Sequence, residues 1–117
     1  MRVAIIGSRN LGGSEGENEC WRKICANVPR NCTEIVSGGA RGIDALAERY
    51  AKENALLFTK FLPEFEKYGK SAPLARNAQI MGYASLVLAF WDGKSRGTAH
   101  AVAACCEAGK PVEVFLI

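Results

Sequence analysis

The sequence "VSGGARGIDALAERYA", residues 36–51, joins the end of a predicted strand to a predicted helix through three glycines in five residues. A simple strand-to-helix connection needs about one glycine, and each further one costs roughly 0.5–1 kcal/mol in ordering entropy relative to alanine. Gly38, Gly39 and Gly42 therefore indicate a backbone that approaches another group closely, and we expect that group to be a ligand.

The composition is that of an ordinary globular domain, because 49% of the 117 residues are hydrophobic and 23% are charged. A chain of this length predicts one domain over residues 1–117. No apolar run approaches the roughly 20 residues that a membrane helix needs, and the apolar start "VAIIG" is too short for the core of a signal peptide. We therefore expect a cytoplasmic protein without a membrane partner.

The cysteines and the charged residues limit the kinds of binding site that the chain could form. The five cysteines form an odd set without a C-x-x-C pair, and the chain has one histidine. This pattern offers no zinc-ligand spacing, so we expect no metal site and interpret the cysteines as reduced packing residues. The net charge of +3 is well short of the density typical of nucleic-acid-binding domains. Cations nevertheless stand beside glycines in four places, as in a local anion site: Arg9, Arg41, Lys94 and Arg96.

Short apolar runs alternate along the chain with segments whose apolar residues recur at helical spacing. The runs predict strands at residues 2–7, 34–37, 56–62, 85–91 and 112–117, and the periodic segments predict helices at 15–28, 42–54, 74–84 and 97–109. Residues 63–73 fit neither period and predict a loop. Strands joined by helical crossovers form parallel sheets. We expect an α/β, Rossmann-like, doubly wound sheet of about five parallel strands in the order 3-2-1-4-5, with helices on both faces.

Four predicted loops leave the carboxyl ends of strands and would open on one edge of that sheet: "GSRN", "SGGARGID", "PEFEKYGK" and "WDGKSRGT". Two of them lead into helix N-termini, whose free amides and partial positive charge suit phosphate. Asp44 could accept a hydrogen bond from a ribose hydroxyl or cap its own helix. Tyr68 and Trp91 could stack on a base, or serve as a loop anchor and a core residue. This edge predicts a site for a nucleotide or phosphosugar.

Two familiar nucleotide-binding motifs do not fit the chain. The "DGKS" segment ends like a P-loop, but the first glycine of that motif would fall at position 88, which is leucine. The segment "GSRNLGG" does not match G-x-G-x-x-G. The sequence therefore supports neither a Walker-type ATPase nor ordinary NAD-dependent hydride transfer.

Four ordered segments together resemble the YspA-like branch of the SLOG superfamily, the Rossmann-like group that also includes the DprA/SMF and Lonely-guy (LOG) proteins. These segments are "GSR" after the first strand, "VSGGARGIDALAERYA", "EKYGKSAPLARNAQI" and "LVLAFWDGKSRGTAHAV". The resemblance implies a nucleotide or nucleotide-derived ligand at the glycine loops, and a sensing role. With the candidates above, the ligand-binding residues we expect are Gly7, Ser8, Arg9, Ser37, Gly38, Gly39, Ala40, Arg41, Gly42, Asp44, Tyr68, Arg76, Asn77, Trp91, Asp92, Gly93, Lys94, Ser95, Arg96, Gly97 and Thr98.

The resemblance also bears on catalysis. The LOG hydrolases carry a glutamate after a Gly-Thr pair, whereas Gly97 and Thr98 are followed here by Ala99. A cleaved N-glycosidic bond needs a nearby carboxylate, so nucleotide binding without turnover is our leading hypothesis. A LOG-like phosphoribohydrolase is the first alternative, with Asp92, Glu64 and His100 as catalytic candidates. Binding of single-stranded DNA in the DprA manner is the second alternative.

Two further expectations concern ligands and partners. No cofactor is assigned with certainty, and ADP-ribose-like or NAD-like molecules are among the nucleotide ligands that the resemblance allows. The helix at residues 97–109 is nearly all small and apolar, and a domain of this size often gains from extra burial. We therefore expect a homodimer or higher homo-oligomer, with a small nucleotide rather than a nucleic acid as the ligand.

Overall fold

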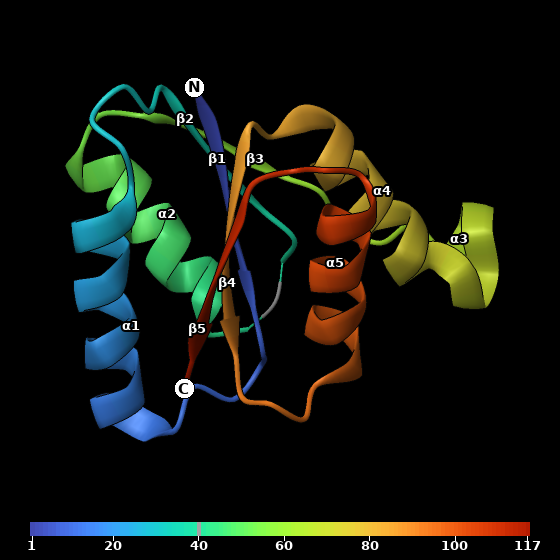
Figure 1. The fold of residues 1–117 in the computed structure, drawn as a ribbon, viewed down its shortest axis with the longest axis horizontal. Coiled ribbons are helices and arrows are strands. Elements are labelled where there is room, and N and C mark those ends of the chain that lie inside the picture. Colours follow the sequence, from blue (N-terminus) through green and yellow to red (C-terminus); the bar gives the residue numbers. More distant parts are fainter. Residues whose placement is uncertain (40) are drawn as a thin grey trace.

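The computed structural model describes residues 1–39 and 41–117 and contains one five-stranded parallel sheet (Figure 1). The strands are β1 (Arg2–Gly7), β2 (Glu34–Ser37), β3 (Leu57–Lys60), β4 (Leu86–Trp91) and β5 (Val112–Leu116). The helices are α1 (Gly13–Asn27), α2 (Ile43–Glu53), α3 (Phe65–Tyr68), α4 (Ala72–Tyr83) and α5 (Arg96–Glu107), with a 3₁₀ turn at Gly69–Ser71. The strand order β3-β2-β1-β4-β5 confirms the predicted topology.

Helices cover both faces of the sheet, so the central strands are buried on both sides. Figure 1 shows α1 and α2 on one face and α4 and α5 on the other. Val3 and Ile5 of β1 pack in the core cluster that holds α1 and α2 residues. Ala4 and Ile6 belong to the cluster that holds α4 and α5 residues. Alternation of side chains along a strand thus explains the continuous apolar run of β1, because each face has its own core.

The register of the sheet fixes where the strands end. Ile5 of β1 pairs with Ser37 of β2 and with Leu88 of β4, all in parallel register. Ser37 pairs in turn with Lys60 of β3. The loops after β1, β2, β3 and β4 therefore leave from the same edge, and the strand order reverses between β1 and β4, where ligands commonly bind in such sheets.

The segment 63–73 departs from the prediction of an irregular loop. Residues Phe65–Tyr68 form one helical turn, in which Lys67 and Tyr68 donate backbone hydrogen bonds to the Glu64 carbonyl at 3.1 and 3.0 Å. A 3₁₀ turn follows, and α4 begins at Ala72. Figure 1 shows α3 projecting beyond α4, away from the sheet. Residues 63–73 show no helical period because α3 has no buried face.

The cysteines occupy both core and surface positions. Cys20, Cys32 and Cys105 are buried, whereas Cys25 and Cys106 are exposed, and all five are free thiols. Burial raises the pKa of the Cys105 thiol. The adjacent Cys105 and Cys106 face different sides of α5, as helical geometry predicts.

The described residues contain neither a membrane-spanning helix nor a cluster of metal ligands. No helix within 1–39 and 41–117 has the length and apolar character needed to cross a membrane. In the same part of the chain, His, Cys, Asp and Glu side chains do not gather in groups of three or more that could hold a metal ion.

Candidate functional site

A cavity of about 670 Å³ opens at the carboxyl edge of the sheet, where β1, β2 and β4 end. Its volume falls within the range of roughly 300–1,000 Å³ that is typical of small-molecule sites. Residues from the three strand-end loops, from the start of α2, from the segment 63–73 and from α4 and α5 form the lining: Ile6, Gly7, Ser8, Arg9, Asn10, Gly38, Gly39, Ile43, Pro63, Phe65, Pro73, Arg76, Asn77, Ile80, Asp92, Ser95, Gly97, Thr98 and Ala101.

The fold brings about half of the predicted site residues into this lining: Gly7, Ser8, Arg9, Gly38, Gly39, Arg76, Asn77, Asp92, Ser95, Gly97 and Thr98. Other candidates in the described structure lie outside it: Ser37, Arg41, Gly42, Asp44, Glu64, Tyr68, Trp91, Gly93, Lys94, Arg96 and His100. Ala40 falls outside the described residues. The candidates near the strand ends thus fall into two groups. Some form the walls of the cavity, and the others support or surround those walls.

The sequence reasoning missed several residues of the lining. Ile6, Ile43 and Ile80 have the apolar character that predicts core packing, and they are indeed buried. Nothing in their spacing distinguishes a cavity floor from a core. Phe65 is different, because a large aromatic residue in a predicted surface loop is itself a signal of a contact surface.

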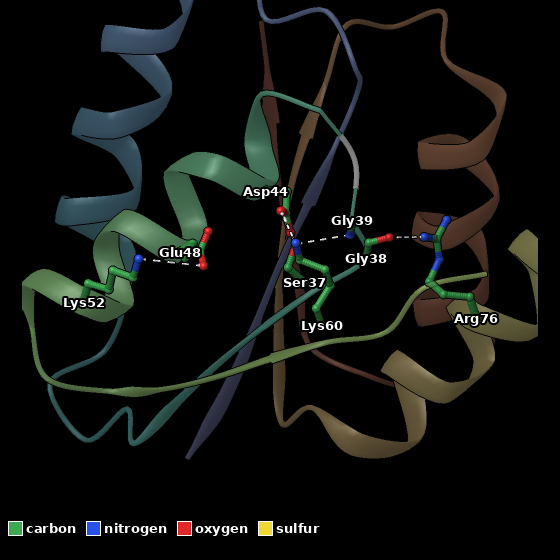
Figure 2. Close-up of polar contacts among 8 residues, drawn as sticks. All are labelled: Ser37, Gly38, Gly39, Asp44, Glu48, Lys52, Lys60 and Arg76. Atoms are coloured by element: carbon green, nitrogen blue, oxygen red, sulfur yellow. Dashed lines mark hydrogen bonds and ion pairs between the residues drawn. The ribbon is translucent and has the colours of Figure 1, made fainter. Parts of the chain in front are cut away.

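Arg76 is the central cation of the cavity. Its Nη1 donates a hydrogen bond to the Gly38 carbonyl (Figure 2). Its Nε donates to Asn77 Oδ1 at 3.0 Å. A Cβ atom at position 38 would lie 3.0 Å from Arg76 Nη1 and 3.3 Å from Cζ. Gly38 is therefore needed in part because the guanidinium of another element passes against its backbone.

The surroundings of Arg76 are unfavourable for its charge. Burial lowers the pKa of this guanidinium, and the positive charge of Arg9 lowers it further. Within residues 1–39 and 41–117, no carboxylate forms an ion pair with Arg76 or Arg9. Since an arginine stays protonated at neutral pH, the cavity lining holds two positive charges that form no ion pair in the described residues.

A second polar cluster fixes the start of α2 against β2 and β3. Asp44 Oδ1 accepts a hydrogen bond from the Ser37 hydroxyl at 2.6 Å (Figure 2). Asp44 Oδ2 forms an ion pair with the Lys60 ammonium at 2.9 Å. The hydrogen bond to Asp44 raises the pKa of Lys60, and the charge of the carboxylate adds to this effect. Both oxygens of Asp44 are thus engaged inside the protein, and the start of α2 has no side-chain cap hydrogen bond, so the predicted helix-cap role is wrong. The ribose-acceptor role stays a prediction.

The loop between β4 and α5 is held by side chains at the end of β4. Asp92 Oδ1 accepts hydrogen bonds from the backbone amides of Lys94 and Ser95, both at 2.8 Å. Both hydrogen bonds lower the pKa of the Asp92 carboxyl, and the bond from the Ser95 amide has the larger effect. The Asp92 amide donates to Ser8 Oγ at 3.2 Å, and the Trp91 indole donates to the Ser95 carbonyl at 3.0 Å. Trp91 and Asp92 therefore shape the loop.

The first turn of α5 faces the cavity through Gly97 and Thr98. Amides at a helix N-terminus have no intrahelical partners, and the helix dipole makes this end partly positive. The hydroxyls of Ser95 and Thr98 lie 3.4 Å apart in the same turn. This wall can accommodate an anion beside Arg9 and Arg76.

The arrangement offers little for acid–base chemistry. Asp92 is the one acidic residue that the described structure places in the cavity lining, and its Oδ1 already binds two amides. His100 lies outside the lining, with Nδ1 3.4 Å from the amide nitrogen of Asn77. Glu64 is exposed on the segment that precedes α3. Of the three catalytic candidates, Asp92 alone therefore lies in the cavity lining.

Comparison with known proteins relates the chain to two groups. The family described as DNA recombination-mediator protein A matches residues 1–57, a segment that contains the loops after β1 and β2. The Gene 61 protein of Mycobacterium phage D29 is 37% identical over 122 residues, which cover 97% of this chain and 95% of that protein. No solved structure matches the chain. The chain therefore belongs to the family of the Gene 61 protein, and its residues 1–57 are similar to DNA recombination-mediator protein A.

Proposed function

We propose that the cavity at the carboxyl edge binds a nucleotide through its phosphate group. The observation that carries the proposal is the half-buried guanidinium of Arg76, which lies near Arg9 and has no carboxylate partner in the described residues. A phosphate between the two arginines would offset both the burial of the charge and the repulsion. Charge-assisted hydrogen bonds of this kind are among the strong polar contacts in proteins.

The form of the cavity favours a ligand larger than a bare anion. Its lining includes hydroxyls and the first turn of α5 as well as apolar side chains from Ile6, Ile43 and Ile80. Small-molecule sites typically combine such an apolar surface with a few polar groups that fix orientation. A nucleotide carries both kinds of group. The resemblance to the YspA-like branch supports the further proposal that binding serves sensing.

The second candidate is binding of single-stranded DNA, and the match to DNA recombination-mediator protein A favours it. Here the cavity would hold one nucleotide of a strand. The exposed cations of the neighbouring loops, Arg41, Lys94 and Arg96, would then contact the flanking phosphates. Such contacts release counterions, so the affinity for a strand would fall steeply with salt concentration.

The test compares two exposed loop arginines at opposite edges of the sheet. Arg9→Gln removes a charge from the cavity lining, whereas Arg30→Gln removes the same charge from the loop between α1 and β2. Binding of AMP is measured by calorimetry, and binding of labelled single-stranded DNA of about ten nucleotides by fluorescence anisotropy at two salt concentrations.

We expect Arg9→Gln to weaken binding about 10- to 100-fold, because it removes a charge-assisted contact to phosphate. Arg30→Gln should leave AMP binding unchanged. A wild-type protein that binds neither AMP nor DNA, or equal losses in the two variants, would contradict the proposal. Tight binding of the oligonucleotide with steep salt dependence, together with weak AMP binding, would select the second candidate.

A further inference from the structure

Phe65 presents a large aromatic surface to the cavity without a partner. It lies in the lining, and 61% of its surface is exposed. The aromatic pairs and cation–π contacts of the described residues all involve other rings. A ring in this position is open to a planar group of a ligand.

The segment that carries Phe65 begins and ends beside the cavity. Pro63 and Pro73 lie on either side of it in the sequence, and both also line the cavity. Proline holds φ near one value, and the helical turn of α3 closes through backbone hydrogen bonds to the Glu64 carbonyl. The turn that carries the ring thus lies between two prolines of the cavity lining.

We propose that Phe65 is the stacking platform for the base of the ligand whose phosphate binds Arg9 and Arg76. This inference rests on the proposed function and extends it to the chemistry of the ligand, which must carry a planar base as well as a phosphate. Pro63, Phe65 and Pro73 give one wall of the cavity an apolar character, and the two arginines give another part its charge. Bases stack on aromatic side chains with little dependence on sequence, since every base has a π-face.

The two aromatic residues that the sequence suggested are placed less well for stacking. Tyr68 lies outside the cavity lining, and the Lys67 ammonium lies 5.2 Å from its ring centroid. The Trp91 indole is bonded to the Ser95 carbonyl and braces the loop before α5. Phe65 is the aromatic side chain that the described structure places in the cavity wall.

The test separates the base from the phosphate. Phe65→Leu keeps an apolar side chain and removes the ring, Phe65→Trp enlarges the ring, and Tyr68→Leu makes the same kind of change outside the lining on the same helical turn. Each protein is titrated with AMP and with ribose 5-phosphate, which lacks the base. A parallel arm uses an oligothymidylate of about ten nucleotides and an abasic strand of equal length, so that free nucleotide and DNA are distinguished.

We expect Phe65→Leu to weaken binding of the base-bearing ligand about 5- to 100-fold and to change binding of the base-free ligand by less than about twofold. Phe65→Trp should bind at least as tightly as the wild type, and Tyr68→Leu should bind like the wild type. The inference is overturned if Phe65→Leu weakens both ligands equally, if it weakens neither, or if Tyr68→Leu has the same effect. A wild-type protein that binds none of the four probes overturns the phosphate site itself.

Discussion

The ion pair between Asp44 and Lys60 is expected to couple the start of α2 to the end of β3. Lys60 Nζ lies 2.9 Å from Asp44 Oδ2, and the exposed fractions of the two side chains are 37% and 14%. Coulomb's law at this distance gives about 6 kcal/mol for an effective dielectric constant of about 20. Solvent screening at Lys60 and the lost freedom of its side chain reduce this value, and fully exposed pairs contribute only about 0.2–1 kcal/mol. We expect a coupling of about 1–2 kcal/mol for this partly buried pair.

The measurement is a double-mutant cycle with Asp44→Asn, Lys60→Met and the double variant, each unfolded in urea. Asp44→Asn should cost more unfolding free energy than Lys60→Met, because Asp44 also accepts the hydrogen bond from the buried Ser37 hydroxyl. The coupling should shrink when salt is raised. A coupling below about 0.3 kcal/mol at low salt, or a larger loss for Lys60→Met than for Asp44→Asn, would refute the reasoning.

The ion pair between Asp44 and Lys60 also predicts that the stability of the fold depends on pH in the alkaline range. The pKa of Lys60 is raised above 10.5 by the hydrogen bond to Asp44 and by its charge. A raised pKa means that the stabilisation is complete below the pKa of the unfolded chain and is lost as pH rises through the folded value. The stability difference between the wild type and Lys60→Met should therefore be constant near neutral pH and should narrow above about pH 10.5.

Three other substitutions have expected outcomes. Gly38→Ala places a Cβ atom 3.0 Å from Arg76 Nη1, so calorimetry should show weaker AMP binding while the free energy of unfolding changes by less than about 1 kcal/mol; unchanged affinity would count against the role of Arg76. Glu34→Gln, at a buried carboxylate that accepts a hydrogen bond from Thr59 at 2.7 Å, should lower the urea-unfolding free energy by about 1 kcal/mol, because charged acceptors form stronger hydrogen bonds; a stabilised variant would contradict this. Backbone amides hold the pKa of Asp92 below 3.8, so its contribution is present above that pH and is lost on acidification. The stability difference between the wild type and Asp92→Asn should therefore narrow below about pH 4, and a pH-independent difference would show that the amides do not favour the charged form.

The parallel sheet was predictable from the alternation of strands and helices, and the order 3-2-1-4-5 is one of the two common doubly wound orders. Parallel strands joined by right-handed crossovers have few arrangements, and residues 36–51 mark one such crossover in the sequence. The loops at the carboxyl edge were predictable for the same reason. Which residues of those loops face the cavity was not predictable, since Arg41, Lys94 and Arg96 have the same sequence signature as Arg9 but lie outside its lining.

Contacts between segments far apart in the sequence could not be predicted either. Asp44 forms its ion pair with Lys60, which is sixteen residues further along the chain. The register of β2 and β3 pairs Lys60 with Ser37, whose hydroxyl donates a hydrogen bond to Asp44. Periodicity did not mark Phe65, because α3 has no buried face and therefore no apolar period; its signal was a large aromatic side chain in a predicted surface loop. Side chains that point toward solvent or into a cavity escape periodicity arguments, which detect packing against a core.

The glycines of the loop after β2 illustrate the same limit. Their number suggested close approach of a ligand, and Gly38 and Gly39 do line the cavity. Gly38 also admits the guanidinium of Arg76, whereas Gly39 and Gly42 adopt left-handed φ values of 80° and 76°, which other residues rarely take. The freedom of this loop thus serves the placement of an arginine and the entry into α2 as much as the ligand. The glycine cluster after β2 marks the site because Gly38 leaves room for the side chain of Arg76. That side chain comes from a helix more than thirty residues away in the sequence.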